Sequence, residues 1–443
     1  MGAFKIKEAN YILYCMEKLE ILYKAFCQNK TISTDTRTIS PNSIFFALKG
    51  ENFNGNKFAL KALENGASMA VVDEDIEGEN PNILKVDNVL ETLQELSNFH
   101  RKKLDIPVIG ITGSNGKTTT KELCHAVLSS KYKTLSTKGN LNNHIGVPLT
   151  LLEIDKSHQI AIVEMGANHV GEIEDLCQIS MPNMGIITNI GKAHLEGFGS
   201  LNGIISTKNA LYNYVINKNG KLFVNGDSEL LMNLSEKSKR YTYGTKNSEL
   251  IGKISHINQP FLSIELPQYN KTIKTKLIGD YNINNVLAAV SLGIHFQIHI
   301  DNIIKSIEEY SPSNNRSQYI VTENNRVILD AYNANPTSTI EALKNFNTLS
   351  DDNKIVILGD MLELGKDSAS EHINILEKLQ KMDLDRAILV GKEYEKHKSN
   401  FNFEYFEDAS SLIKYLKESP LQNLTILIKG SRGIKLETLL PYL

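Results

Sequence analysis

The sequence alternates short apolar runs with longer stretches in which apolar residues recur at helical spacing. Short, near-continuous apolar runs are typical of parallel strands, because helices cover both faces of such a sheet. The runs predicted as strands are 44–48, 69–72, 106–111, 160–163, 184–188, 326–330, 354–358, 387–390 and 424–428. Helices are predicted over 57–65, 90–104, 117–130 and 281–295. This alternation predicts an α/β fold class with parallel sheets.

Residues 240–279 show a different pattern, in which apolar and polar residues alternate, as in Phe261-Leu-Ser-Ile-Glu-Leu266. Alternation places apolar side chains on one face of a strand and polar side chains on the other. This stretch therefore predicts antiparallel strands.

Composition and charge indicate which class of protein the sequence encodes. Hydrophobic residues make up 41% and charged residues 22% of the chain, which is typical of a soluble globular protein. The net charge of −3 does not favour nucleic acid or an acidic membrane as a partner. No apolar run reaches 18 residues, and no export signal is recognised. The 4 cysteines form no CxxC pair and are predicted to be reduced, so we expect a cytoplasmic location.

The strongest chemical motif follows the predicted strand at 106–111. The sequence Thr112-Gly-Ser-Asn-Gly-Lys-Thr118 joins this strand to a predicted helix. Two glycines allow the backbone to curl, so that successive N–H groups and the helix N-terminus face a polyphosphate. Lys117 would reach the β- and γ-phosphates, and the Thr118 hydroxyl would bind Mg²⁺. Ile111 stands where the strict pattern GxxxxGK(S/T) has glycine, and the alternative is an ordinary βα turn.

The length of the chain and the positions of the predicted strands and helices together predict the domain organisation. A chain of 443 residues is too long for one hydrophobic core. We predict a small N-terminal α/β domain over 1–87 and a central P-loop-type parallel-sheet ATPase domain over 88–313. A C-terminal Rossmann-like α/β domain is predicted over 314–443.

Other polar side chains also follow predicted strands. Glu164 directly follows one apolar run, and His194 lies in the loop after another. Ligands of open parallel sheets gather beyond the carboxyl ends of the strands, where a carboxylate and an imidazole can hold Mg²⁺ against phosphates. The alternatives are a helix-capping carboxylate and an ordinary loop histidine. Asn282 and Asn285 lie three apart, on one face of the first turn of a predicted helix.

Several further motifs lie along the whole chain. They are Asp35-Thr-Arg37, Phe45-Phe-Ala-Leu-Lys-Gly-Glu51, Thr112-Gly-Ser-Asn-Gly-Lys-Thr118, Glu164-Met-Gly-Ala167, Asn189-Ile-Gly-Lys-Ala-His-Leu-Glu-Gly-Phe-Gly-Ser200, Asp330-Ala-Tyr-Asn-Ala-Asn-Pro336, Gly359-Asp-Met-Leu-Glu-Leu-Gly365 and Lys429-Gly-Ser-Arg432. Together they resemble the motifs of the Mur ligases of peptidoglycan synthesis. The motifs at 332–336 and 359–365 are similar to those of the family member that adds a dipeptide.

The resemblance implies an ATP-dependent ligase that joins D-alanyl-D-alanine to UDP-N-acetylmuramoyl-tripeptide through an acyl phosphate. The product would be the pentapeptide precursor of peptidoglycan, which serves cell wall biogenesis, cell shape and cell division. ATP and two Mg²⁺ ions are implied, and we expect a monomer. The third peptide residue is either lysine or diaminopimelate. The alternatives are an amide ligase of the diaminopimelate-adding or folylpolyglutamate type, and a P-loop nucleotide-binding regulatory module.

The resemblance also implies residue roles. The ATP-binding residues would be Thr112, Gly113, Ser114, Asn115, Gly116, Lys117, Thr118, Asn282, Asn285, Arg316 and Asp330. The Mg²⁺ ligands would be Thr118, Glu164, His194 and Lys208, the last as a carbamate formed with CO₂. The substrate-binding residues would be Asp35, Thr36, Arg37, Asn140, Asn142, Asn143, Tyr332, Asn333 and Asn335. The catalytic residues would be Lys117, Lys208 and His194.

Domain roles follow from the same resemblance. The N-terminal domain would bind the uridine end of the UDP-sugar, and the central domain would bind ATP. The C-terminal domain would bind the incoming dipeptide and close over ATP. On residue chemistry alone, Asp35 and Arg37 also fit a surface turn, 332–336 fits a plain βα turn, and Lys208 fits a solvated helix residue.

Overall fold

The computed structural model describes residues 17–257, 259–349 and 353–443 of a chain that divides into two compact units. The first unit contains Met1–Gly110, Lys133–Met165 and Glu174–Pro182. The second unit contains Ile111–Tyr132, Gly166–Ile173 and Asn183–Leu443.

A four-stranded parallel sheet lies in the first unit. Its order is β1 (Ile32–Ser33), β2 (Ile44–Phe46), β5 (Met69–Val72), β6 (Ile83–Lys85). Ile44 and Phe46 pack in one core with α3 (Val89–Lys102), whereas Phe45 packs in another with α2 (Ala59–Glu64). Burial on both faces explains the continuous apolar run of β2. Shorter elements of this region are η1 (Thr36–Thr38), β3 (Lys49–Gly50), β4 (Phe53–Asn54) and η2 (Gly55–Phe58).

A seven-stranded sheet carries the strands of the P-loop region. Its order is β13 (Leu250–Ile251), β12 (Lys239–Gly244), β11 (Lys221–Asn225), β10 (Met184–Ile187), β7 (Val108–Thr112), β9 (Ile160–Glu164), β8 (Thr134–Ser136). The boundary between the two units falls within β7. The prediction of parallel strands is confirmed for β9, which pairs with β8 in the first unit, and for β10, which pairs with β11 in the second. The partners β8 and β11 were not predicted.

The prediction of antiparallel strands over 240–279 is only partly correct. Within the second unit, β12 and β13 pair in parallel, so the prediction is wrong for them. The crossover helix α9 (Glu229–Leu234) between β11 and β12 allows this direction. Their mixed polarity reflects a place at or beside the edge of the sheet, where part of each strand is solvated. The prediction is confirmed for the three-stranded antiparallel sheet of β14 (Lys253–Ser255), β15 (Phe261–Leu266) and β16 (Lys271–Ile278).

The P-loop helix α4 (Lys117–Ser129) is held by two neighbours in the second unit. It packs along α10 (Ile283–His295), whose side chains are apolar almost all round, and α11 (Ile300–Glu309) packs on both. Other helices of this region of the sequence are α5 (Gly146–Leu152), α6 (Glu172–Ser180), α7 (Leu195–Phe198) and α8 (Leu201–Asn217). None of the helices in the described part of the chain is long and apolar enough to cross a membrane.

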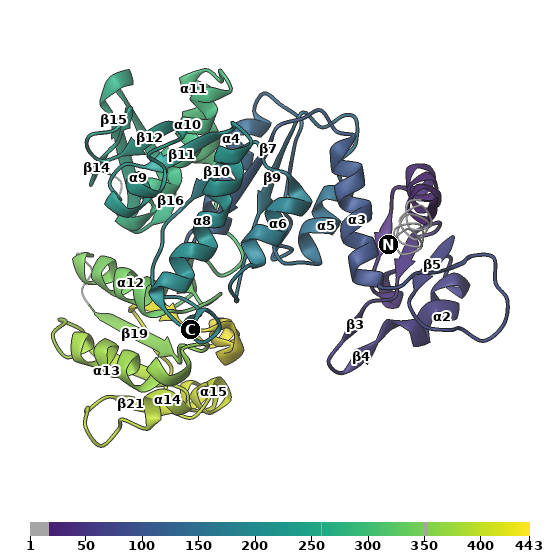
Figure 1. The fold of residues 1–443 in the computed structure, drawn as a ribbon. Coiled ribbons are helices and arrows are strands. Elements are labelled where there is room, and N and C mark those ends of the chain that lie inside the picture. Colours follow the sequence, from purple (N-terminus) through teal and green to yellow (C-terminus); the bar gives the residue numbers. More distant parts are fainter. Residues whose placement is uncertain (1–16, 258, 350–352) are drawn as a thin grey trace. The chain divides into compact units, whose positions relative to one another are not determined.

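A six-stranded sheet forms the C-terminal part of the second unit (Figure 1). Its order is β17 (Gln318–Val321), β18 (Arg326–Asp330), β22 (Thr425–Lys429), β19 (Lys354–Gly359), β20 (Arg386–Val390), β21 (Glu404–Phe406). Only the pairing of β17 with β18 is antiparallel among these strands. The predicted strands are confirmed as β18, β19, β20 and β22, whereas β17 and β21 were not predicted because neither is a continuous apolar run.

Helices cover both faces of this sheet. One core contains alternate residues of the strands together with α12 (Pro336–Thr348) and α13 (Ser368–Leu379). The other contains the intervening strand residues with α15 (Ala409–Glu418) and η7 (Leu436–Tyr442). Burial on both faces is the arrangement expected of a Rossmann-like sheet, and it leaves the strand ends as the place for polar groups.

The P-loop turn (113–116) between β7 and α4 depends on two glycines. Gly113 has a φ of 148°, and Gly116, the N-cap residue of α4, has a φ of 77°. A Cβ atom on Gly113 would lie 1.9 Å from Thr188 Oγ1, and one on Gly116 would lie 2.7 Å from Asn285 Oδ1. Positive φ and the lack of space both require glycine at these two positions.

We expect Gly113→Ala to destabilise the protein, because the new methyl group would push Thr188 away from the P-loop turn. Gly171→Ala is the matched control, since Gly171 has a φ of 96° but a Cβ atom there would meet no atom within 4 Å. The two variants share the cost of positive φ, and overpacking adds about 1–3 kcal/mol to Gly113→Ala alone. Denaturant titration measures this difference, and equal free energies of unfolding for the two variants would contradict the account.

Candidate active site

Residues that follow β10 hold the P-loop turn in place. Thr188 donates a hydrogen bond from Oγ1 to the Asn115 carbonyl (2.6 Å), and the Asn189 side chain bonds both the N–H and the carbonyl of Asn115 (3.0 Å each). Ser114 Oγ donates to the Gly191 carbonyl (2.9 Å). These bonds fix the directions of the N–H groups in the turn. Thr188 and Asn189 were not predicted as site residues, although their place at the end of a predicted strand was a usable signal.

Positive charge collects at the start of α4. Lys117 Nζ donates hydrogen bonds to the carbonyls of Gly113 (2.7 Å) and Ser114 (3.2 Å), so its ammonium lies over the P-loop turn. Thr118 follows in the first turn of the helix and is buried, and Thr112 ends β7. A lysine, a helix N-terminus and backbone N–H groups together favour an anion at this place.

The predicted asparagine pair lies beside the P-loop helix. Asn285 Nδ2 donates to Asn282 Oδ1 (2.8 Å), and Asn285 Oδ1 accepts from Thr120 Oγ1 (3.1 Å). Asn282 Nδ2 donates to the Ile278 carbonyl (2.8 Å). Both asparagines are buried, with 3% and 8% of their surface exposed. They therefore join the start of α10 to α4, and their contact with adenine stays a prediction.

Lys208 lies on α8 and is almost completely buried, with 2% of its surface exposed. Its Nζ lies 5.4 Å from the centroid of the Phe198 ring. Burial and, to a smaller extent, the positive charge of Lys117 lower the pKa of Lys208 to about 7, whereas Glu172 opposes the shift. The alternative of a solvated helix residue is wrong. Near neutral pH a large fraction of Lys208 is an uncharged amine.

His194 contacts the loop that follows β19. It adopts a left-handed conformation, with a φ of 51°, directly before α7. Its Nδ1 lies 2.6 Å from Glu363 Oε2, and this close approach of His194 lowers the pKa of Glu363. Nearby, Lys192 Nζ donates to Glu371 Oε1 (2.7 Å). These pairs connect the loop after β10 to the C-terminal sheet, and the sequence analysis identified only His194.

Glu164 ends β9 in the first unit, where 1% of its surface is exposed. Its backbone N–H donates to Thr137 Oγ1 (3.0 Å), and its Oε1 accepts from Asn142 Nδ2 (2.7 Å). Asn143 Oδ1 instead accepts the N–H groups of Ile145 and Gly146 at the start of α5, whereas Asn140 is exposed. Of the three predicted substrate-binding asparagines, Asn140 and Asn143 are exposed, and Asn142 is half-buried.

The predicted uridine-binding residues lie at a 3₁₀ turn of the first unit. Asp35 caps this turn, which begins at Thr36. The Arg37 guanidinium donates to both carboxylate oxygens of Asp35, at 2.6–3.0 Å. Hydrogen bonds from Arg37 lower the pKa of Asp35 to about 2. The arginine remains exposed to solvent, so it is free to meet a ligand through the outer side of its guanidinium.

Predicted residues of the C-terminal sheet have partners that were not predicted. Asp330 Oδ2 accepts from the buried Lys429 (2.7 Å). Asn335 is the N-cap of α12, and its Nδ2 donates to Asn115 Oδ1 in the P-loop turn (2.7 Å). Asn333 accepts the Ala334 N–H through its side chain. A substitution of Asn335 would therefore remove both a helix cap and a contact to the P-loop turn.

Buried polar side chains hold the loop that follows β19 through hydrogen bonds. The Asp360 carboxylate accepts two backbone N–H groups at the start of α14 (Lys392–Glu395), at 2.9 and 3.0 Å. His372 Nε2 accepts the Met361 N–H (3.1 Å), which assigns the ring proton to Nδ1, 2.7 Å from the Ser368 carbonyl. Burial raises the pKa of Asp360 and lowers that of His372. These buried groups hold the loop that carries Glu363.

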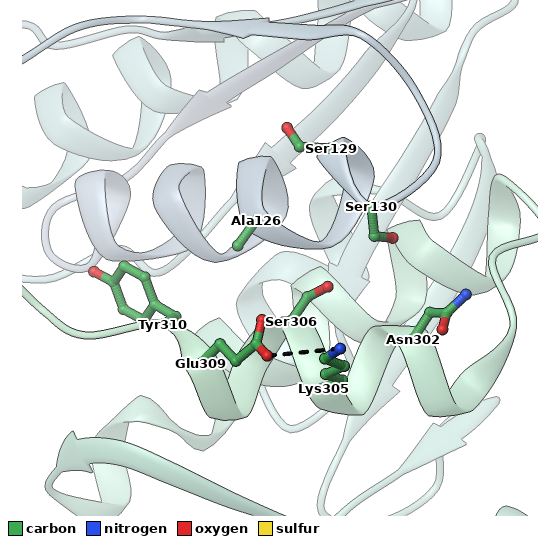
Figure 2. A pocket seen from close by; sticks show the side chains of 8 residues that line it. All are labelled: Ala126, Ser129, Ser130, Asn302, Lys305, Ser306, Glu309 and Tyr310. Carbon is green, nitrogen blue, oxygen red and sulfur yellow. Dashed lines mark ion pairs between the residues drawn. The ribbon is translucent and has the colours of Figure 1, made fainter.

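A polar groove of about 550 Å³ lies elsewhere in the second unit (Figure 2). It runs between the C-terminal half of α4 and α11 and contains an ion pair between Lys305 and Glu309 (3.9 Å). Its lining residues are Ala126, Ser129, Ser130, Asn302, Lys305, Ser306, Glu309 and Tyr310. None of them is a predicted site residue, so the groove is separate from the chemistry at the other end of α4.

Oxygen donors at two predicted positions suit Mg²⁺. They are the Thr118 hydroxyl in the second unit and the Glu164 carboxylate in the first. Over residues 17–257, 259–349 and 353–443, no group of three or more His, Cys, Asp or Glu side chains is arranged to hold a metal ion. Mg²⁺ is commonly bound by one or two protein oxygens together with phosphates and water, so each donor taken by itself is of a kind that Mg²⁺ accepts, and its role stays a prediction.

Comparison with known proteins covers the same parts of the chain. Three family profiles match: Mur ligase family, catalytic domain (29–101), Mur ligase middle domain (111–293), and Mur ligase, glutamate ligase domain (315–432). The UDP-N-acetylmuramoyl-tripeptide–D-alanyl-D-alanine ligase of Bacillus subtilis is 34% identical over 418 residues, which are 92% of this chain and 91% of that protein.

Two solved structures share the fold. MurF from Acinetobacter baumannii has a TM-score of 0.85 and 31% identity, over 93% of each chain. The MurF ligase from Thermotoga maritima, solved in complex with ADP, has a TM-score of 0.83 and 25% identity, over 94% of this chain and 97% of that one. The resemblance found in the motifs is thereby confirmed along the length of the chain, which belongs to the Mur ligase family.

Proposed function

We propose that the chain is an ATP-dependent ligase that joins D-alanyl-D-alanine to UDP-N-acetylmuramoyl-tripeptide. The observation that carries this proposal is the similarity, over 92% of the chain, to a ligase with this name. The P-loop turn supports the use of a nucleotide, and one similar structure contains ADP. The product is the pentapeptide precursor of peptidoglycan, made in the cytoplasm, with lysine or diaminopimelate as its third residue.

The alternative functions explain fewer of the observed features of the chain. A diaminopimelate-adding or folylpolyglutamate-type ligase would use the same P-loop turn, but it would not explain the similarity to dipeptide-adding ligases through the C-terminal sheet. A regulatory P-loop module would leave the polar loops at 332–336 and 359–365 without a purpose.

The chemistry begins with activation of the tripeptide, because a carboxylate is a poor acceptor for an amine. A carboxylate oxygen attacks the γ-phosphorus of ATP, the bond to ADP breaks, and an acyl phosphate forms. The neutral amine of the dipeptide then attacks the acyl carbon and loses one proton. The amide bond forms, and phosphate leaves with the former carboxylate oxygen. The protein accelerates these steps mainly by positioning and by stabilising negative charge.

Lys117 and the P-loop turn supply that charge stabilisation. The ammonium now bonds the Gly113 and Ser114 carbonyls, and it moves to the phosphates when the nucleotide enters the turn. The N–H groups at the start of α4 are assigned to the same anion. Within the turn, the N–H groups of Ser114 and Asn115 instead donate to Asn189. We assign further contacts with ATP to Asn282, Asn285, Arg316 and Asp330, following the family motifs.

Mg²⁺ neutralises charge on the phosphates when it is bound. Thr118 and Glu164 offer the oxygen ligands for it, and His194 offers a nitrogen ligand for a second ion. His194 would first release Glu363, because the imidazole Nδ1 now contacts that carboxylate.

Lys208 is proposed to act as a carbamate. An amine reacts with CO₂ only in its neutral form, and burial lowers the pKa of Lys208 to about 7. The amine attacks the carbon of CO₂ and loses a proton, which gives an N-carboxylate with two oxygens. This converts a cation into an anionic oxygen ligand, removing a repulsion of roughly 4 kcal/mol per unit charge at 4 Å and an effective dielectric of 20.

The remaining substrates are assigned to the outer parts of the sequence. We place the uridine end of the UDP-sugar with Asp35, Thr36 and Arg37 in the domain over 1–87. The dipeptide is assigned to Tyr332, Asn333 and Asn335 in the domain over 314–443, which closes over ATP bound by 88–313.

A coupled phosphate-release assay tests the proposed function. We expect release only when ATP, D-alanyl-D-alanine and the UDP-tripeptide, offered with lysine and with diaminopimelate, are all present. Lys117→Ala should lower the rate by about 10²–10³-fold, because one charge-stabilising group is lost. Lys131→Ala is the control, because Lys131 lies just past the other end of α4, and this variant should keep the wild-type rate. Release that ignores the dipeptide would contradict the proposed function, and an active Lys117→Ala would contradict the role of the lysine.

The carbamate has its own test. Lys208→Ala should be nearly inactive, and a short-chain carboxylic acid in excess should restore part of its rate by replacing the lost ligand. Removal of CO₂ should lower the wild-type rate reversibly and leave the variant unchanged. Lys218→Ala, at the exposed end of α8, is the control that keeps the response to CO₂. Full activity of Lys208→Ala in CO₂-free buffer would exclude the carbamate.

A further inference from the structure

Two arginines approach one aromatic ring at the carboxyl edge of the six-stranded sheet. The Arg316 guanidinium carbon lies 3.6 Å from the centroid of the Tyr332 ring, and that of Arg432 lies 5.6 Å from the same centroid. Arg316 is half-buried and its Nε is enclosed, whereas Arg432 is exposed. The family motifs assign Arg316 to the phosphates, and Arg432 has no assigned role.

Arg432 has no acidic partner among the residues that the structure describes, whereas two nearby lysines each have one. Lys429 is paired with Asp330 at 2.7 Å, and Lys192 is paired with Glu371 at 2.7 Å. The Arg432 guanidinium makes no hydrogen bond or ion pair with any residue that the structure describes. Its full charge and its five N–H donors are thus directed at solvent or at a ligand.

The residue before Arg432 contacts two loops: the loop at 332–336, to which the dipeptide is assigned, and the loop at 359–365. Ser431 is buried, its Oγ accepts the Leu362 N–H (2.9 Å), and the same Oγ donates to the Ala334 carbonyl (3.4 Å). The Ser431 N–H donates to the Asp360 carbonyl (3.2 Å). The backbone that carries Arg432 is therefore fixed relative to both loops, although the guanidinium itself is exposed.

An exposed apolar side chain lies beside the residue that follows Arg432. Leu362 has 42% of its surface exposed, and a Cβ atom on Gly433 would lie 2.9 Å from its Cδ1. A leucine and a tyrosine ring beside a free guanidinium suit a small ligand that has methyl groups and one carboxylate. Such a ligand can place its methyl groups on the apolar surface and its carboxylate on the guanidinium.

We propose that Arg432 binds the terminal carboxylate of the incoming dipeptide. This inference rests on the proposed function, in which the amine end of D-alanyl-D-alanine reacts and the carboxylate end does not. A bidentate guanidinium–carboxylate contact would hold the unreactive end and aim the amine at the acyl phosphate. Arg432 thereby selects a free dipeptide over one whose carboxyl group is blocked.

The test compares D-alanyl-D-alanine with its C-terminal amide, which has nearly the same shape and no negative charge. The wild type should use the amide with a kcat/KM about 10- to 100-fold lower, as expected for loss of a charged hydrogen bond. Arg432→Ala should lose a similar factor with the dipeptide, accept the two amines almost equally, and keep its KM for ATP. Arg432→Lys should retain part of the discrimination.

Arg386→Ala is the matched control, because Arg386 lies on β20 and is paired with Glu404 (2.6 Å). It should keep the wild-type ratio between the two amines. If the wild type uses the amide as well as the dipeptide, or if Arg432→Ala keeps the wild-type discrimination, the role of Arg432 is overturned and the proposed function stands. If the wild type ligates neither amine, the proposed function fails, and the role of Arg432 fails with it.

Discussion

The close contact between the P-loop turn and its two neighbours constrains the rest of the second unit. A side chain on Gly113 would clash with Thr188, and one on Gly116 would clash with Asn285. The turn is thus fixed by β10 on one side and by α10 on the other, with hydrogen bonds from Thr188 and Asn189 to the backbone of Asn115. Because the turn is held on both sides, the backbone of Lys117 and the start of α4 are also held in place. Charge stabilisation by preorganised groups requires such fixed positions.

Two buried lysines reduce the free-energy cost of burying a positive charge in different ways. Removal of a charge from water is unfavourable unless the charge is paired or lost. Lys429 keeps a partner, Asp330, and so joins β22 to β18 at the edge of the sheet. Lys208 has a positive neighbour, Lys117, and a ring near its Nζ, so burial lowers its pKa to about 7. The first arrangement supports the loop at 332–336, and the second leaves a neutral amine for reaction with CO₂.

Local patterns in the sequence were sufficient for most strands of the parallel sheets and for the P-loop turn. The apolar runs of β18, β19, β20 and β22 are continuous because both faces are buried, so they were recognisable without tertiary information. The strands β12 and β13 were given the wrong direction, since partial solvation near a sheet edge produces the same alternation as antiparallel pairing. Pairing direction depends on the crossover, which local polarity does not encode.

The partners of the site residues could not be predicted in the same way. Asn335 meets Asn115 across 220 positions of sequence, and Lys192 meets Glu371 across 179. Neither pair has a local signal. The sequence left a solvated helix residue open as the alternative for Lys208, because the burial of one polar side chain depends on which helix face the fold covers. The motifs therefore identified candidate residues, whereas the structure was needed to find what each of them touches.

The central claim is that ATP activates the carboxylate of the tripeptide by phosphorylation, and oxygen labelling tests it most directly. The terminal carboxylate is labelled with ¹⁸O in both oxygens, the enzyme is given ATP and D-alanyl-D-alanine, and the released phosphate is analysed by mass spectrometry. The account predicts one ¹⁸O atom in the phosphate for each amide bond formed, because the bridging oxygen of the acyl phosphate leaves with phosphorus. Unlabelled phosphate, or label in AMP released with pyrophosphate, would contradict it.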